Sequence, residues 1–285
     1  MLLVALRTRF MIALAAGFCA AICLLASRAF GVPPVEGLDI SLLNGGQPIL
    51  SILVIAVTFI GGATLVSLAV GRWSHEAGLF AAAVGLAVFA VRGGSISTTL
   101  RYSSGAGVYM LLAIELVLMY AMVVAAIWLS HRWSKAAPLA QTEANDEQPS
   151  RTHHLFAVGV QAVTMAIIML AVGQSESKKQ AMATVMLAAY AGSIAAHYTF
   201  PILRGHWLAF GPLLVGIVGY FLEGSKPTLL PIGLVDQPMA IALPIELVSA
   251  GIIGGILGHW MSQKWADEAA GQTLPPLPAK ITTAP

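Results

Sequence analysis

The chain has 285 residues, of which 58% are hydrophobic and only 10% are charged, and its mean hydropathy is +0.82. Since an average soluble domain carries roughly 25% charged residues, this composition excludes a soluble globular protein. The net charge of +2 excludes nucleic-acid binding through a basic face, and the two cysteines exclude a disulfide framework. We therefore expect an all-α integral membrane protein.

Eight apolar segments approach the length of about 20 residues that a transmembrane helix needs. They run over residues 10–27, 49–71, 76–91, 106–130, 155–173, 181–200, 207–222 and 238–261. Because lipid offers the backbone no hydrogen-bond partners, these segments are predicted to be transmembrane helices. The third and seventh segments are short, and paired short spans are typical of the binding region in transporters built from repeats. The simpler alternative is that both helices extend by a few polar residues, or that the membrane thins locally.

The first segment has two interpretations. Arg7 and Arg9 precede its apolar residues and Ser27-Arg28-Ala29 follows them, which also fits a cleaved signal peptide. The repeat described next pairs this segment with the fifth one, and so favours a retained helix. With eight spans, more of the Lys and Arg residues in the short loops fall on the side of the membrane that holds the N-terminus than on the other side. The side with more Lys and Arg is ordinarily the cytoplasmic one. We therefore expect both termini in the cytoplasm, and the short loops suggest a bacterial inner membrane.

An internal repeat relates the two halves of the chain at a fixed offset of 131 residues. Ile114-Glu115-Leu116-Val117 recurs as Ile245-Glu246-Leu247-Val248, and the same offset pairs His75 with His206. Four spans in each half would give both halves the same orientation, with a pseudo-twofold axis along the membrane normal. Chance matching of two apolar sequences is the alternative. The predicted units are a first repeat over 1–131, a charged linker over 132–154, a second repeat over 155–266 and a disordered Pro-rich tail over 267–285.

Glu115 and Glu246 are the acidic residues that fall inside the apolar segments, and they occupy equivalent positions in the repeat. Insertion scales put the cost of a charged residue at a helix centre at about 2.5–3.5 kcal/mol, so a function is the default explanation. We interpret this pair as a site for an ion, a proton or a substrate. The alternative is a pair of hydrogen-bonded or wet carboxyl groups that only tie helices together.

Four further residues are secondary candidates for this site. His75 and His206 begin equivalent helices, whereas Arg92 and Glu223 are equivalent positions of opposite charge. This predicts an ion pair across the pseudo-axis. The histidines all fall at predicted cytoplasmic helix ends or in the linker, where an interfacial position without a ligand is the simpler interpretation. Several tryptophans, Trp260 among them, fall at the same boundary, as in an aromatic belt.

The last segment carries two interleaved GxxxG patterns, which predict close helix packing. They are formed by Gly251, Gly254, Gly255 and Gly258.

These features favour a transporter or channel built on the two glutamates. The alternative is a structural or assembly subunit of a membrane complex that docks through the Gly-rich helix face. An enzyme or redox protein is a third interpretation that no motif supports, and we assign no catalytic residue, metal ligand or cofactor. The expected partners are the lipid bilayer, a small ion or solute, and a second copy or a membrane partner protein; nucleic acid is not expected.

Overall fold

The computed structural model describes residues 2–29, 48–70, 76–92, 95–96, 106–134, 151–173, 177–200, 205–226 and 237–269. Within these ranges the regular structure is helical and no strand occurs. The α-helices are α1 (Leu2–Ala29), α2 (Pro48–Val70), α3 (Ala77–Arg92), α5 (Ala106–Ser134), α6 (Arg151–Val172), α7 (Lys178–Thr199), α8 (Gly211–Gly224) and α9 (Pro244–Ala269). Two 3-10 helices, η2 (Gly205–Ala209) and η3 (Pro238–Ala240), precede α8 and α9.

The all-helical class is confirmed, and each predicted apolar segment overlaps one of the α-helices. Four stretches of the described residues are long and apolar enough to cross a membrane: Gly107–Ser130, Thr152–Val172, Gly205–Gly224 and Pro244–Ala269. Shorter apolar helices cover Phe10–Leu25, Ile52–Leu68 and Ala77–Arg92. The chain is therefore a helical membrane protein by length and composition, and the count of eight spans stays a prediction.

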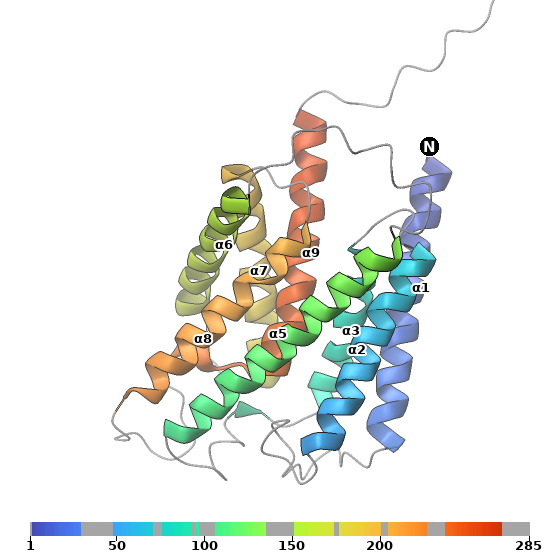
Figure 1. Ribbon diagram of the computed structural model, residues 1–285. Coiled ribbons are helices and arrows are strands. Elements are labelled where there is room, and N and C mark those ends of the chain that lie inside the picture. The colour runs from blue at the N-terminus through green and yellow to red at the C-terminus, as the bar shows by residue number, and fades with distance from the viewer. Residues whose placement is uncertain are drawn as a thin grey trace, which may run out of the picture.

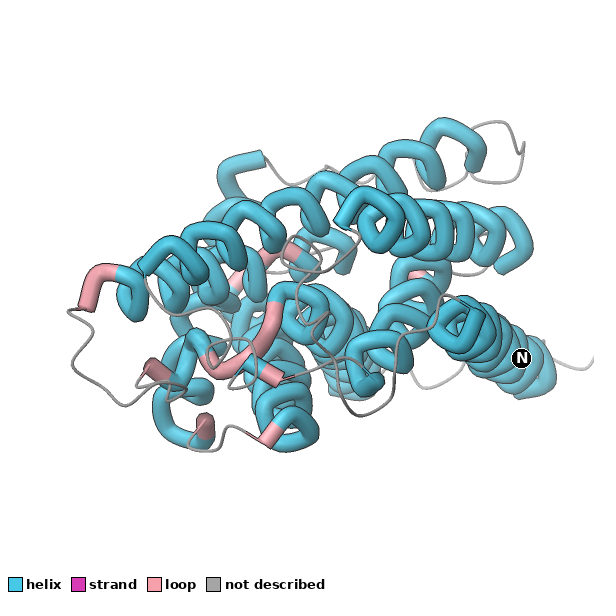
Figure 2. Tube along the Cα trace, turned by 90° about the horizontal axis from the view of Figure 1, so that it is seen from below, coloured by secondary structure: helices cyan, strands magenta, loops and turns pink. Residues whose placement is uncertain are grey.

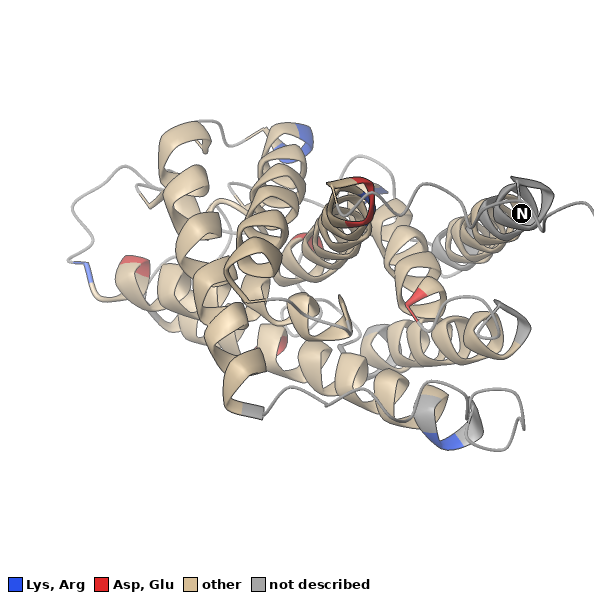
Figure 3. Cartoon of the chain, turned by 90° about the horizontal axis from the view of Figure 1, so that it is seen from above, with Lys and Arg blue, Asp and Glu red and all other residues tan. Residues whose placement is uncertain are grey.

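The helices form an elongated bundle (Figures 1 and 2). In Figure 1, α1, α2 and α3 lie on one side, α6 and α7 lie on the other, and α9 stands between them. The green α5 and the orange α8 cross the front obliquely. Charged residues occupy few turns of the described helices (Figure 3). On α5, Met110, Val117 and Val124 point outward and are half exposed or more, which suits lipid contact.

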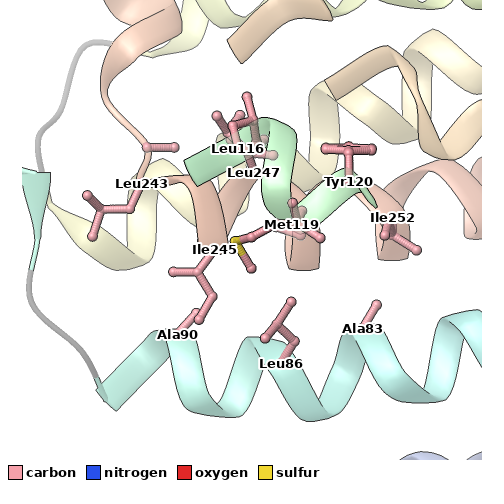
Figure 4. Packing of buried hydrophobic residues seen from close by; sticks show 14 of the residues in the cluster. Ala83, Leu86, Ala90, Leu116, Met119, Tyr120, Leu243, Ile245, Leu247 and Ile252 are labelled. Carbon is pink, nitrogen blue, oxygen red and sulfur yellow. The ribbon is translucent and has the colours of Figure 1, made fainter. Parts of the chain in front are cut away.

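One apolar core runs through both halves of the molecule. Its buried members come from α2 and α3 as well as from α5 to α9. Figure 4 shows the centre of this core, where Leu86 of α3, Met119 of α5 and Ile245 of α9 face the same space. The two halves therefore share a core and do not fold around separate ones.

The helix contacts do not confirm the predicted repeat, because the contacts within the two predicted halves differ. If α3 corresponds to α8 and α5 to α9, then the observed contacts of α3 with α9 and of α5 with α8 exchange under the repeat. Within the halves, α1 packs mainly against α3, but α6 packs mainly against α7. Gly85 explains the first arrangement, because its missing side chain lets α3 approach the Cys19 carbonyl of α1.

Two predicted boundaries differ from the helix ends. The linker was predicted over 132–154, but α5 continues to Ser134 and α6 begins at Arg151. The tail was predicted from residue 267, and α9 continues to Ala269. The remaining parts of both predicted segments, 135–150 and 270–285, lie outside the described residues.

Candidate functional site: buried polar clusters on α9

Glu115 and Glu246 are both buried between the two halves of the bundle. Glu115 lies well inside α5 and is 2% exposed, and Glu246 is 1% exposed. The helices that carry them, α5 and α9, contact each other. Burial of two carboxyl groups without polar partners would be costly, so their surroundings decide what they can do.

Glu246 lies inside the last apolar span, but at its beginning. The last segment was predicted from residue 238, but α9 begins at Pro244 and places Glu246 in its first turn. Proline fits the first position of a helix because its missing N–H would have had no partner there. Residues 238–240 form η3 instead. Glu246 therefore lies at a helix N-terminus, where unpaired N–H groups favour a negative charge.

Glu246 has two polar partners at this helix end. The Leu243 N–H donates to Glu246 Oε2 at 2.9 Å, which is half of a capping box. Lys178 Nζ, from the first turn of α7, lies 3.7 Å from Glu246 Oε1. Since the Lys178 side chain is 16% exposed, this ion pair is largely removed from solvent. The negative charge of the Glu246 carboxylate is thus stabilised by the Lys178 ammonium and the Leu243 N–H, which both belong to the second half of the chain.

Tyr220 of α8 joins the two glutamates into one cluster. Its hydroxyl donates to the Ala242 carbonyl at 2.6 Å. Glu115, Glu246 and Tyr109 each act on Tyr220 by a coulombic interaction. The cluster therefore combines groups from α5, α8 and α9, and Lys178 extends it to α7.

Gly216 explains how α8 comes close to both glutamate-bearing helices. A Cβ at Gly216 would lie 2.6 Å from the Leu116 side chain and 2.7 Å from the Leu247 side chain. These two leucines directly follow Glu115 and Glu246 in the sequence. The short α8 is thus seated against the residues that directly follow the two glutamates.

Sequence reasoning missed Tyr220 and Lys178. Tyr220 belongs to a predicted short segment, and its position next to Gly219 was a signal, since Gly219 lets α8 approach the Met239 backbone. Lys178 lies just before the predicted segment 181–200, where a lysine at a helix end is ordinarily solvated. Only the fold brings it to the start of α9.

The secondary candidates do not join this cluster. Glu223 forms an ion pair with Lys226, three residues later, at 3.3 Å, and the pairing with Arg92 stays a prediction. Lys226 lies just after the end of α8, close to this carboxylate in the chain. His206 lies in η2 with its ring 5.9 Å from that of Trp207. His75 lies outside the described residues.

The glycines of α9 pack against neighbours within the same chain. A Cβ at Gly254 or Gly258 would overlap the Met186 or Tyr190 carbonyl of α7. On the adjoining face, a Cβ at Gly251 would lie 2.5 Å from Pro212, and one at Gly255 would lie 2.9 Å from the Leu208 carbonyl. These glycine positions are therefore covered within the chain and do not form an open docking surface.

A second polar cluster surrounds Glu76, the residue that precedes α3. The Trp260 Nε1–H of α9 donates to Glu76 Oε2 at 2.8 Å, and the Gly205 N–H of η2 donates to Glu76 Oε1. His259 Nε2 lies 3.7 Å from Glu76 Oε1. A carboxyl group of the first half is thus held by groups of the second half.

Burial raises the pKa of the Glu76 carboxyl above its usual 4.5, and the hydrogen bonds from Trp260 and Gly205 offset part of this increase. The ring of His197, from α7, lies edge-on to His259 with 5.3 Å between centroids. Trp260 was expected in an interfacial belt and His259 at a helix end, but Trp260 bonds to Glu76 and His259 is fully buried. The sequence held no signal for this contact, because Glu76 and Trp260 are 184 residues apart.

Among the residues that the structure describes, no group of three or more His, Cys, Asp or Glu side chains could hold a metal ion. Comparison of the chain with protein-family models, with curated proteins and with solved structures finds no match. We therefore infer the function from the geometry of the two clusters.

Proposed function

We propose that this membrane protein is a transporter whose ion or solute site is the cluster of Glu115, Glu246 and Tyr220. The observation that carries the proposal is the burial of both carboxyl groups on the contacting helices α5 and α9, where α8 is seated at Gly216 against Leu116 and Leu247. Acidic residues at this depth ordinarily serve ion or proton pathways. The cluster lies at contacts between the predicted halves, which is where repeat-built transporters bind their substrates.

The charges of the cluster favour a cation or a proton as its ligand. With both carboxyl groups ionised and Lys178 protonated, the three side chains carry a formal net charge of −1, which a monovalent cation or a proton would neutralise. Glu246 Oε1 has no hydrogen-bond partner, and the 3.7 Å to Lys178 Nζ is longer than a hydrogen bond. This oxygen is therefore the place where a ligand would compete with Lys178.

The proposed movement of the halves, the number of spans and the orientation in the membrane are those expected from the sequence. The two halves would rock against each other around the cluster, with eight spans and both termini on the cytoplasmic side of a bacterial inner membrane. The alternative, an assembly subunit that docks through the glycine face of α9, loses support because Gly254 and Gly258 pack against α7.

Ion flux into proteoliposomes tests the proposal. Purified protein is reconstituted with a dye inside that is sensitive to protons, Na⁺ or K⁺, and a gradient of the corresponding ion is imposed. Wild type should move at least one of these ions, and Glu115→Gln or Glu246→Gln should reduce that flux at least tenfold. Glu268→Gln is the matched control on α9, since the Glu268 side chain is exposed and forms an ion pair with Lys264 in its own helix.

A folding defect is separated from a transport defect by the double variant Lys178→Met with Glu246→Gln, which removes both members of the ion pair. All variants are compared by gel filtration and circular dichroism. Wild-type vesicles that move none of the three ions, or glutamine variants that keep full flux, would contradict the proposal. Stable co-purification of a second membrane protein would then favour the assembly alternative.

A further inference from the structure

The contact between Glu76 and His259 has the features of a site that binds one proton. The Glu76 carboxylate already accepts hydrogen bonds from the Trp260 side chain and the Gly205 backbone. His259 is fully buried, and neither of its ring nitrogens has a hydrogen-bond partner. At 3.7 Å, its Nε2 is too far from Glu76 Oε1 for a hydrogen bond but close enough to feel its charge.

Two unpaired nitrogens in a buried ring are unusual, because buried polar atoms are almost always hydrogen-bonded. A merely structural imidazole would place at least one nitrogen against a donor or an acceptor. In this protein the Glu76 oxygen lies next to His259 Nε2 without bonding to it. The neutral His259 ring therefore lacks a hydrogen bond to Glu76. A protonated ring could donate this hydrogen bond from Nε2.

The charged and titratable groups around His259 among the described residues come from three neighbouring elements. Glu76 faces it from the start of α3, and His197 packs edge-on from α7. His206 belongs to η2, whose Gly205 lies against the His259 ring. On α9 itself, the exposed Asp267 acts on His197 by a coulombic interaction. His197 is partly exposed and so links the buried ring to the solvent side.

We propose that Glu76 and His259 form a protonation site that joins the two halves of the molecule. In the protonation step, hydronium gives its proton to His259 Nε2, a new N–H bond forms, and water is released. The resulting imidazolium lies against the ionised Glu76 carboxylate and converts the 3.7 Å contact into a charge-assisted hydrogen bond. The first half, through Glu76, is then held more tightly to α9.

This site is separate from the cluster of Glu115, Glu246 and Tyr220. His259 lies 13 residues after Glu246 on the continuous helix α9, which corresponds to about 20 Å along the axis. The inference therefore does not depend on transport, and it can hold or fail on its own.

Nitrogen NMR of the histidine rings tests the proposal directly. The protein is labelled with ¹⁵N-histidine, placed in lipid nanodiscs and titrated from pH 2.5 to 9, and the His259 signals are assigned from their loss in His259→Gln. In wild type we expect His259 to titrate within this range. In Glu76→Gln the midpoint should fall by at least one pH unit, a tenfold weaker proton affinity. His153→Gln is the matched control, because His153 lies on another helix, α6, and packs against Phe200, and it should leave the His259 midpoint unchanged.

Two results would overturn the proposal: a His259 ring that stays neutral over the whole range, or a midpoint that is the same in wild type and Glu76→Gln. If Glu76→Gln does not fold, Trp260→Phe takes its place. This variant removes one donor from the Glu76 carboxylate and leaves its charge, so the attraction for the imidazolium should strengthen and the midpoint should rise. A midpoint that falls or stays the same in Trp260→Phe would also contradict the proposal.

Discussion

The two polar clusters differ in which part of the chain balances their buried carboxylates. Glu246 is balanced within the second half, by the Leu243 N–H at the start of its own helix and by Lys178 of α7. Glu76 belongs to the first half, and its hydrogen bonds come from η2 and α9 in the second half. The first arrangement survives a movement between the halves, whereas the second depends on the halves staying in contact.

We therefore expect the two ends of α9 to have different functions. A carboxylate that keeps its local partners can remain a binding group while the bundle rearranges around it. The partners of Glu76 lie in the other half of the chain. The contact between the halves should therefore depend on the protonation of Glu76 and of His259. The following predictions test each side of this comparison, from the largest expected effect to the smallest.

Loss of Lys178 should have the largest effect. Lys178→Met leaves the Glu246 carboxylate buried with only the Leu243 N–H, and breaking a buried pair in this way costs about 3 kcal/mol of unfolding free energy. Circular dichroism during titration with SDS in mixed micelles measures the change. Lys264→Met breaks the exposed pair with Glu268 and should change the stability by about 0.5 kcal/mol or less. Equal effects of the two variants would contradict a buried ion pair at Glu246.

A methyl group at Gly205 should disturb the Glu76 cluster next most strongly. The Cβ would overlap the His259 ring and lie 2.7 Å from Glu76 Oε1. Overpacking of this kind costs roughly 2 kcal/mol, measured by the same SDS titration. Gly159→Ala is the matched control, because no atom lies within 4 Å of its added Cβ. If Gly205→Ala left the stability unchanged, Gly205 would be packed less tightly against His259 and Glu76 than described.

Trp260→Phe should have a smaller effect on stability. It removes the 2.8 Å hydrogen bond to Glu76 and keeps an aromatic ring against Phe80. A hydrogen bond to a charged group contributes about 1.5 kcal/mol. Trp265→Phe, at an exposed position on the same helix, should leave the unfolding midpoint nearly unchanged. If Trp265→Phe destabilised the protein as much as Trp260→Phe did, the bond to Glu76 would not be the cause.

The smallest effect concerns pH. Burial raises the pKa of Glu76 above 4.5, so the folded protein holds this proton more tightly than the unfolded chain does. The stability that Glu76 contributes is therefore present below pH 4.5 and is lost as the pH rises through its folded pKa. We expect the Tm of wild type minus that of Glu76→Gln to decline from pH 4.5 to 8. A difference that rises with pH would mean that the hydrogen bonds outweigh burial.

The sequence predicted the helices well, because hydrophobic length alone decides which segments can enter a bilayer. It also pointed to Glu115 and Glu246, since an acidic residue in an apolar segment is visible without a fold. It could not predict that Glu246 lies at a helix end. Pro244 was visible, but the helix start depends on how residues 237–243 pack under α8.

The partners of the buried carboxyl groups could not be predicted either. Lys178 and Glu246 are 68 residues apart, and Glu76 and Trp260 are 184 apart. Such contacts depend on helix packing, which close approach at Gly254 and Gly258 partly sets. Local patterns report burial and helix formation, whereas long-range pairing is a property of the assembled bundle.

The central claim is that Glu115 and Glu246 belong to one site, and carbodiimide labelling tests it most directly. A hydrophobic carbodiimide modifies protonated carboxyl groups in apolar surroundings, and mass spectrometry measures the labelled fraction of Glu246 against pH. In Glu115→Gln, the loss of a neighbouring negative charge should move the midpoint for Glu246 to lower pH, whereas Glu268→Gln should leave it in place. An unchanged midpoint in Glu115→Gln would mean that the two carboxyl groups are independent, and the account of a shared site would be wrong.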